Sequence, residues 1–324
     1  MQTAGRPRPE SGRPKNRLAA SLLSLQVFPV DVNAEIEYHK HVPELEEPPA
    51  PTAPEKFREY AEAPHRTWKP LHRFLGFIHE ARPATLLEIG CGAGQLTTRL
   101  AKTGYRVTAL ELSPELVAAT RRRAELDGVA ERIEAVEANL ETYDPGERRF
   151  DLVVAKLVLH HVRVEKALDV IVKALKPGGV AVVWEPVAFC PWLQKFRDLM
   201  PVKKDISPNE RQLNQADLEM IAARFERVQM EVFYLLGRVR RLLPAGLRAG
   251  GMMAGIEKLD AFLLRNLPCL RPMAGTMVLR CQNPITDPAR RAERQKIRHY
   301  PQLIKGALND AKLPREFPLT QNGS

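Results

Sequence analysis

The stretch that decides the fold is residues 86–96, Leu-Leu-Glu-Ile-Gly-Cys-Gly-Ala-Gly-Gln-Leu. A short apolar strand containing Glu88 leads into three alternating glycines, Gly90, Gly92 and Gly94, and apolar residues then recur at helical spacing. Glycine permits positive φ and close approach of a ligand to the backbone, and the amides that begin a helix point toward that ligand. The stretch therefore predicts a strand, a turn and a helix that bind a small ligand at the turn.

The kind of ligand follows from the glycine spacing and from two acids. The spacing is G-x-G-x-G, which differs from the G-x-G-x-x-G of nicotinamide and flavin binders. Glu88 would repel a pyrophosphate but would attract an ammonium or a sulfonium. The next strand, 105–110, ends at Glu111, 21 residues after Gly90. An acid at this position is placed to accept the hydroxyls of a ribose.

These residues resemble the class I S-adenosylmethionine-dependent methyltransferases, in particular their small-molecule branch. In that family the first motif is E/D-x-G-x-G-x-G and the second strand ends in an acid. The strand 150–155 and the Leu-Lys-Pro-Gly-Gly run at 175–179 resemble later motifs, so the likeness extends over residues 84–186. The structural alternative is an ordinary strand-to-helix turn with an exposed acid.

The resemblance implies a Rossmann-like, doubly wound α/β fold. Its sheet has seven mostly parallel strands and ends in an antiparallel edge hairpin. Strand patterns lie at 86–89, 107–110, 133–136, 150–155, 180–184, 224–235 and 275–281, and helical patterns lie at 95–103, 114–127 and 165–175. Ser113 is predicted to cap the second of these helices, with Pro114 in its first turn.

Three further segments surround this domain, which we predict to span residues 55–283. Residues 1–54 are predicted to be a disordered or surface-docked tail with a proline-rich linker, and a targeting role is the alternative for its basic start. Helices within 55–82 are predicted to form a lid, in which Tyr60, His65 and Trp68 would line the pocket or simply pack. A helical insertion is expected at 237–272, and a basic extension, arranged as a helix or an arm, at 284–324.

The resemblance also implies the residues that contact S-adenosylmethionine, the co-substrate. They come from the glycine turn and from the ends of the second, third and fourth strands: Glu88, Gly90, Cys91, Gly92, Gly94, Glu111, Leu112, Asn139, Leu140 and Lys156. Asn139 stands where family members usually have an acid that binds the adenine amino group, and its side-chain oxygen can accept the same hydrogen bond.

The catalytic candidates follow the fourth and fifth strands, because the substrate in this fold lies beyond the carboxyl ends of those strands. They are His160, His161 and Glu185. Chain neighbours point in different directions, so only one of the two histidines is expected to face the site. Glu185 would serve as a base or orient the substrate, or would form a salt bridge with Lys156. The four cysteines are widely scattered, and no metal site is predicted.

Three functions are compatible with these patterns. The first is methylation of an O, N or C atom of a small, lipophilic molecule by a cytoplasmic enzyme. The second is methylation of RNA or protein, with the C-terminal part as an electrostatic anchor, because residues 237–324 hold 16 basic and 6 acidic residues, the whole net charge of +10. The absence of an N-P-P-Y motif argues against that reading. The third is a scaffold that binds the cofactor without turnover.

The insertion at 237–272 is amphipathic and has more than one interpretation. It would form a lid over a lipophilic acceptor, rest on an anionic membrane surface, or only cover the edge of the sheet. The sequence does not predict an oligomeric state.

Overall fold

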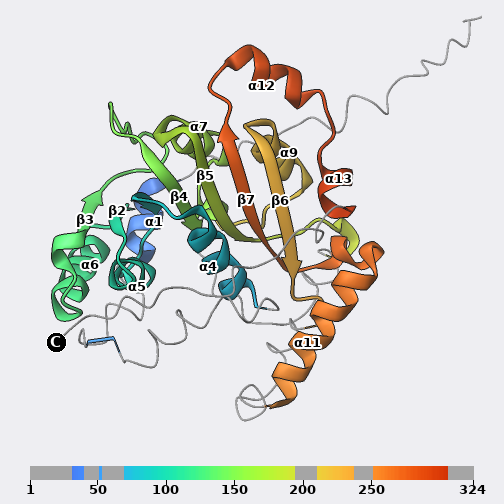
Figure 1. Ribbon diagram of the computed structural model, residues 1–324, viewed down its shortest axis with the longest axis horizontal. Coiled ribbons are helices and arrows are strands. Elements are labelled where there is room, and N and C mark those ends of the chain that lie inside the picture. Colours follow the sequence, from blue (N-terminus) through green and yellow to red (C-terminus); the bar gives the residue numbers. More distant parts are fainter. Residues whose placement is uncertain (1–30, 40–50, 53–68, 194–209, 237–250, 306–324) are drawn as a thin grey trace, which may run out of the picture.

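The computed structural model describes residues 31–39, 51–52, 69–193, 210–236 and 251–305. Within these ranges the chain forms a seven-stranded sheet in the order β3-β2-β1-β4-β5-β7-β6 (Figure 1). The strands are β1 (Thr85–Ile89), β2 (Arg106–Glu111), β3 (Ile133–Glu137), β4 (Phe150–Lys156), β5 (Leu175–Pro186), β6 (Phe225–Phe233) and β7 (Thr276–Pro284). The first five run parallel, and β7 pairs antiparallel with both β5 and β6. The predicted fold class is confirmed.

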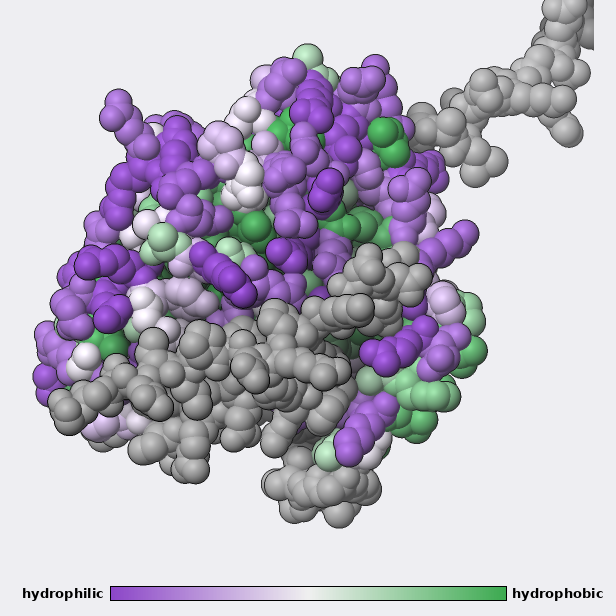
Figure 2. Space-filling model, in the orientation of Figure 1, coloured by the Kyte–Doolittle hydropathy of each residue, from purple (hydrophilic) through white to green (hydrophobic). Residues whose placement is uncertain are grey.

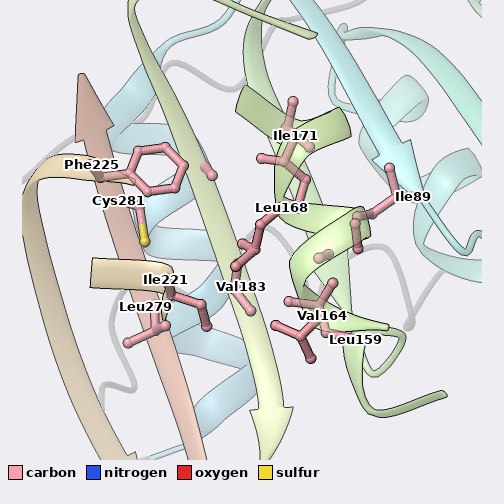
Figure 3. Close-up of a cluster of buried hydrophobic side chains, with 14 of the residues drawn as sticks. Ile89, Leu159, Val164, Leu168, Ile171, Val183, Ile221, Phe225, Leu279 and Cys281 are labelled. Carbon is pink, nitrogen blue, oxygen red and sulfur yellow. The ribbon is translucent and has the colours of Figure 1, made fainter. Parts of the chain in front are cut away.

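Helices cover both faces of the sheet because alternate residues of each strand point to opposite sides. On β4, Leu152 and Val154 belong to one apolar cluster, whereas Val153 and Ala155 belong to the other. Helices α4 (Pro70–Ala81), α5 (Gln95–Lys102) and α6 (Pro114–Leu126) pack on the first face. Helices α7 (Val164–Ala174), α9 (Gln215–Ala223) and α13 (Tyr300–Lys305) pack on the second, part of which Figure 3 shows.

The described ranges also contain the α-helices α1 (Val32–His39), α11 (Gly251–Asn266) and α12 (Pro288–Gln295) and the 3-10 helices η2 (Ala130–Arg132), η3 (Leu159–His161) and η5 (Pro268–Met273). The predicted cap of α6 is confirmed, because the Ser113 hydroxyl accepts a hydrogen bond from the Leu116 amide at 3.3 Å. One boundary differs from the prediction. The strand pattern was placed at 180–184, after a helical pattern at 165–175, but β5 already begins at Leu175, opposite Phe150, and then changes register.

The predicted lid is corrected where the structure describes it. Helix α4 does not lie over the carboxyl edge of the sheet; it packs on one face with Phe74, Phe77 and Ile78 fully buried against β4, β5 and β7. Its apolar spacing is that of a core helix, which a sequence pattern cannot distinguish from a lid helix. Tyr60, His65 and Trp68 lie outside the described residues.

A buried ion network ties α4 to the antiparallel strands. Arg73 is 2% exposed, and its Nε donates to Glu231 Oε1 on β6 at 2.5 Å. Its Nη1 donates to Glu80 at 3.0 Å, and Glu80 also accepts from Arg280 on β7 at 2.6 Å. The guanidinium carbon of Arg73 lies 3.8 Å from the centre of the Phe77 ring. Because charges this deep need partners, the network fixes where α4 meets the sheet.

Both ends of the described chain pack against the domain. Residues 1–54 were predicted to be a disordered or surface-docked tail with a proline-rich linker, and within them residues 32–39 form helix α1, in which Glu35 is buried. Thr52 donates from its amide and its hydroxyl to Asp127 at 2.7 and 2.8 Å. At the other end, Ile304 of α13 is buried in the core beside the sheet. The segment 288–305 is therefore part of the packed structure.

Candidate functional site

The carboxyl ends of the parallel strands bring the predicted site residues to one edge of the sheet. Register pairs Ile89 with Leu110 on one side and with Ala155 on the other, so the glycine turn lies between the ends of β2 and β4. Lys156 pairs with Trp184, which places Glu185 beside the end of β4. Residues far apart in sequence thus meet where ligands bind in doubly wound sheets.

Each glycine of the turn has a positive φ, but for different reasons. The values are 66°, 55° and 76° for Gly90, Gly92 and Gly94. A Cβ on Gly90 would lie 2.5 Å from Val158, and one on Gly94 would lie 2.8 Å from Thr120. Among the described residues other than its chain neighbours, none has an atom within 4 Å of a Cβ placed on Gly92. Gly90 and Gly94 therefore allow tight packing, whereas Gly92 leaves bare backbone with room for a ligand.

Glu111 links the end of β2 to the glycine turn. Its Oε2 accepts from the Gly92 amide at 2.9 Å, and its Oε1 accepts from the amides of Leu112 and Ser113 at 2.7 and 3.1 Å. The residue is 9% exposed. A carboxylate offers about four acceptor positions, so these three bonds orient Glu111 and leave capacity for a ligand hydroxyl.

Glu88 is a buried acid that interacts with the positive charge of Lys156. It is 3% exposed, and its Oε2 accepts from the Thr97 hydroxyl at 2.7 Å. Burial raises the pKa of Glu88 to about 7, and the Thr97 hydrogen bond and the charge of Lys156 only partly oppose that shift. Burial also lowers the pKa of Lys156, whose Nζ lies 5.5 Å from the centre of the Trp184 ring. A cation arriving at Glu88 would therefore favour ionisation of this carboxyl.

The remaining predicted cofactor contacts hold the loops in place. Cys91 is 8% exposed; its amide donates to Leu110 at 3.0 Å, and burial raises the pKa of its thiol. Asn139 uses its side-chain oxygen to accept from the Glu141 amide at 2.9 Å, and Leu140 is buried in the core. A contact between Asn139 and an adenine stays a prediction. In such a contact the adenine amino group would share the Asn139 side-chain oxygen with the Glu141 amide.

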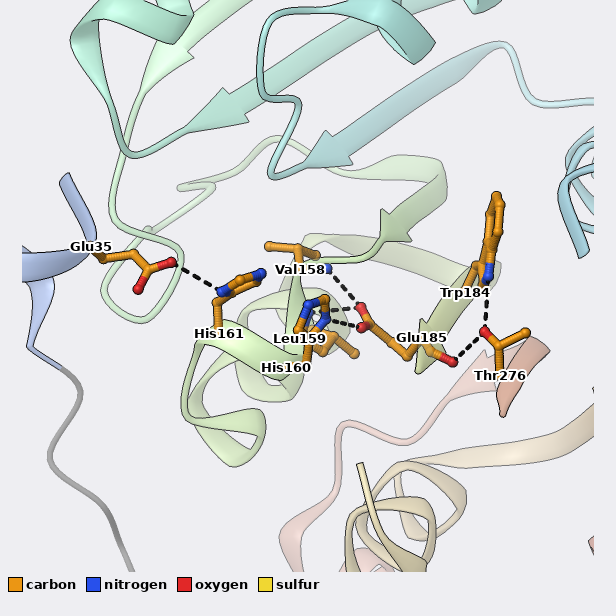
Figure 4. A network of polar contacts seen from close by, with 8 residues as sticks. All are labelled: Glu35, Val158, Leu159, His160, His161, Trp184, Glu185 and Thr276. Carbon is orange, nitrogen blue, oxygen red and sulfur yellow. Dashed lines mark hydrogen bonds and ion pairs between the residues drawn. The ribbon is translucent and has the colours of Figure 1, made fainter. Parts of the chain in front are cut away.

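Glu185 and His160 form a buried pair. Glu185 is fully buried; its Oε1 accepts from the amides of Val158 and Leu159 at 2.8 and 2.7 Å, and its Oε2 lies 2.6 Å from His160 Nδ1 (Figure 4). Its carbonyl accepts from Thr276, which itself accepts from the Trp184 indole. The alternative of a Glu185–Lys156 salt bridge is wrong, since Glu185 uses its carboxylate to shape the loop after β4.

His161 contacts a residue that the sequence did not single out. Its Nδ1 lies 3.0 Å from Oε1 of Glu35, on helix α1. The ring centres of His160 and His161 are 4.0 Å apart, so the two imidazoles lie side by side. The sequence had predicted that these neighbouring side chains point in different directions. They are held by different carboxylates. The 3-10 turn η3 brings these consecutive side chains together.

Glu35 was missed because nothing in its own segment indicates a site. A local signal for the helix does exist: Asp31 accepts from the Ala34 amide at 3.0 Å, as an N-cap does. That signal predicts the start of α1, but it does not predict where the helix packs.

Comparison with known proteins agrees with this geometry. Residues 87–183 match the family model described as a methyltransferase domain. The chain is 36% identical over 126 residues to a ubiquinone biosynthesis O-methyltransferase of Xylella fastidiosa, covering 36% of this chain and 50% of the relative. It is 30% identical over 145 residues to the ubiquinone/menaquinone biosynthesis C-methyltransferase UbiE of Nitrobacter hamburgensis, covering 43% and 57%.

Among solved structures, the N-methyltransferase NodS from Bradyrhizobium japonicum in complex with S-adenosyl-L-homocysteine has a TM-score of 0.46 and 15% identity, over 78% of this chain and 100% of that one. The chain spans about half the length of the curated relatives it matches. Residues 87–183 thus match a methyltransferase domain, and the strand order around them is the one implied by the resemblance to the class I S-adenosylmethionine-dependent methyltransferases.

Proposed function

We propose that this protein transfers a methyl group from S-adenosylmethionine to a small, lipophilic acceptor. The observation that carries the proposal is the arrangement of two acids around one glycine turn. Glu88 precedes the last residue of β1, and Glu111 at the end of β2 accepts from the Gly92 amide. A cationic nucleoside suits this pair, because one acid can bind ribose hydroxyls and the other can face positive charge.

The protein residues have distinct tasks in this proposal. Glu111 would accept from the ribose hydroxyls, the backbone at Gly92 would lie along the ligand, and Glu88 would face its ammonium. Asn139 and Leu140 would border the adenine, and the bound cofactor supplies an electrophilic methyl group. Methyl transfer is a one-step displacement, so the enzyme's main task is to hold the acceptor atom in line with the methyl group.

The class of acceptor is inferred from the relatives. The two curated relatives described above carry names that refer to O- and C-methylation in quinone biosynthesis. We infer an acceptor of the same kind, a small phenol related to quinones, methylated at a hydroxyl oxygen. His160, His161 and Glu185 lie at the edge where such a hydroxyl would be bound, and a histidine there can take up its proton.

The proposed function is tested by calorimetric titration of S-adenosylmethionine into the full chain, followed by mass spectrometry of reactions with substituted catechols. We expect saturable binding of the cofactor and products heavier by one methyl group. A chain that binds the cofactor but methylates none of the catechols would contradict the phenolic acceptor. A well-folded chain that does not bind the cofactor would contradict the whole proposal.

The raised pKa of Glu88 predicts that the affinity of the protein for the cofactor depends on pH. Because its pKa is about 7 and a cationic ligand favours the ionised form, binding at pH 6 should be about tenfold weaker than at pH 8 and should release a proton. Calorimetry at pH 6 in two buffers with different ionisation enthalpies measures the proton release. The control is Glu88→Gln, which should bind more weakly and show no such release. Equal apparent enthalpies for the wild type in both buffers would overturn this role for Glu88.

In the described part of the basic segment, the arginines of α12 do not form a surface reserved for a nucleic acid. On α12, Arg290 pairs with Glu226, Arg291 donates to the Ile285 carbonyl, and Arg294 donates to the Ala222 carbonyl. These arginines of the basic segment contact the protein itself. Deleting 284–324 would therefore also remove packing around Ile304, and the loss of activity would not identify an RNA anchor.

The insertion supports a proposal of contact with an anionic membrane surface. In the described ranges no helix has the length and apolarity needed to cross a bilayer. Helix α11 nevertheless exposes Leu259 (47%) and Phe262 (62%), with the exposed cations Lys258 and Arg265 on the same helix (Figure 2). Apolar side chains flanked by basic ones are typical of helices that lie in a membrane interface.

Replacing Phe262 by serine tests this contact. We expect Phe262→Ser to weaken binding to vesicles containing anionic lipid by about tenfold, as removal of one large buried apolar side chain would. The matched control is Ile297→Ser, which removes another exposed apolar residue (47%), beyond α12. Sedimentation with vesicles measures binding. Equal binding of both variants and the wild type would show that α11 does not contact the lipid.

A further inference from the structure

Leu157, the residue directly after β4, has an unfavourable backbone conformation. Its φ is 57°, in the left-handed region. Residues with bulky side chains rarely adopt this conformation, because their Cβ then crowds the following carbonyl oxygen. In the turn after β1 the same conformation is adopted by glycines, which have no Cβ. The backbone conformation therefore does not explain why a leucine stands at this position.

Core packing does not explain this leucine either. Alternation along β4 would place Leu157 with Val153 and Ala155, which belong to the apolar cluster on the second face of the sheet. The left-handed turn redirects the chain before that can happen. Leu157 is 42% exposed, and it belongs to neither apolar cluster of the described residues. Its side chain thus contributes little to the stability of the core.

The left-handed turn is held by hydrogen bonds of the surrounding loop. The amide of Leu157 donates to the Trp184 carbonyl at 2.8 Å. The amides of the next two residues, Val158 and Leu159, donate to Glu185 at 2.8 and 2.7 Å. Because Glu185 is fully buried, its carboxylate holds the loop rigidly against the end of β5. The backbone at Leu157 is thereby fixed, and its apolar side chain is held at the surface.

The two chain neighbours of Leu157 connect it to the glycine turn. On one side, the charge of Lys156 acts on the Glu88 carboxyl. On the other side, Val158 packs so closely on Gly90 that a Cβ there would lie 2.5 Å from it. In doubly wound sheets, ligands bind beyond the carboxyl ends of the strands, where this loop lies. An exposed apolar side chain therefore stands next to the turn at which we place the cofactor.

We propose that Leu157 is a specificity-determining residue that contacts the apolar part of the methyl acceptor. This inference rests on the proposed function. The ligand class is a phenol that carries an apolar substituent. When the substituent covers Leu157, both apolar surfaces leave water, which favours such an acceptor over a more polar one. Because the turn is already rigid, the contact forms without the entropic cost of ordering a loop.

The test compares two acceptors that differ only in an apolar chain, catechol and octylcatechol. The variants are Leu157→Gly and Leu157→Asn, since glycine and asparagine both tolerate a left-handed backbone but remove the apolar side chain. The matched control is Arg82→Gly. Arg82 is also left-handed, with a φ of 45°, and exposed, but it precedes β1 at the opposite edge of the sheet. Cofactor affinity and melting temperature are measured for the full chain of each protein.

For octylcatechol, we expect kcat/KM to fall about tenfold in both Leu157 variants, the effect of losing the burial of one leucine side chain. For catechol we expect a change of less than about twofold, because it has no chain to contact the leucine. The melting temperature of Leu157→Gly should be unchanged or higher, because the substitution relieves the left-handed strain. Cofactor affinity should be unchanged, and Arg82→Gly should methylate both acceptors as the wild type does.

Three results would overturn the inference. Losses of the same size with catechol would show that Leu157 only shapes the loop. Unchanged rates with octylcatechol would show that the acceptor does not contact this side chain, and so would a wild type that does not prefer octylcatechol to catechol. Leu157→Asn keeps the test decisive if the glycine variant fails to fold. Failure of the proposed function itself is distinguishable, because the wild type would then not bind the cofactor or would methylate neither acceptor.

Discussion

Replacing Glu111 by alanine is expected to weaken the binding of S-adenosylmethionine by at least about 100-fold, or about 3 kcal/mol. Two losses combine in this variant. The ribose hydroxyls lose a charged acceptor, and the amides of Gly92, Leu112 and Ser113 lose the carboxylate that fixes the turn. Hydrogen bonds to a charged group contribute about 1.5–3 kcal/mol each, so loss of the ribose contact alone accounts for much of the effect.

Calorimetric titration of the cofactor measures this change. The matched control is Glu137→Ala, because Glu137 pairs in register with Glu111 at the end of β3 but is exposed. It should bind the cofactor as the wild type does. Loss of affinity in both variants would indicate that the net charge of the edge matters rather than the position of Glu111, and retained affinity in Glu111→Ala would contradict the ribose contact.

Replacing Arg73 by leucine is expected to lower the free energy of unfolding by about 3–5 kcal/mol, the usual effect of removing one partner of a buried ion pair. The variant leaves Glu231 on β6 without its main partner, while Glu80 keeps Arg280. Burial already raises the pKa of Glu231 although Arg73 opposes it, and without Arg73 the pKa rises further.

The pH dependence of this loss has a definite sign. When the pKa of a carboxyl is higher in the folded than in the unfolded state, the carboxyl stabilises the folded state at pH values below its unfolded pKa of about 4.5. This stabilisation is lost as the pH rises through the folded-state pKa. The gap between Arg73→Leu and the wild type should therefore widen from pH 5 to pH 8. Urea unfolding measures it. As a control, Lys173→Met breaks a solvent-exposed pair with Asp144, which is 2.7 Å long, and should change the free energy of unfolding far less. Similar losses in the two variants would contradict the importance of burial.

The sequence predicted the central fold because its signals there are local. The glycine turn, the Ser113 cap and the apolar strands each specify conformation within a few residues, and their order along the chain leaves few ways to arrange a parallel sheet. The match of residues 87–183 to a methyltransferase domain and the strand order confirm that prediction. The individual roles of Glu88, Asn139 and Lys156 toward a ligand stay predictions.

The predictions that failed concern packing. The apolar spacing in 70–81 is compatible with a lid or a core helix, and only the opposing surface of β4, β5 and β7, together with the partners of Arg73, decides for the core. Likewise, the sequence alone offers several basic residues as partners for Glu185, an acid at the end of a strand. The 3-10 turn after β4 determines that His160 rather than Lys156 reaches it.

By itself, the sequence determined the class of fold, the glycine turn after β1 and the two acids beside that turn. Those properties depend on backbone conformation and hydrophobic periodicity, which neighbouring residues specify. Only the tertiary structure decided that Glu35 meets His161, that the two imidazoles lie side by side and that α4 belongs to the core. Among the contacts of α4, Glu80 and Arg280 are 200 positions apart. Such contacts form because buried charges and apolar faces must find partners once water is excluded.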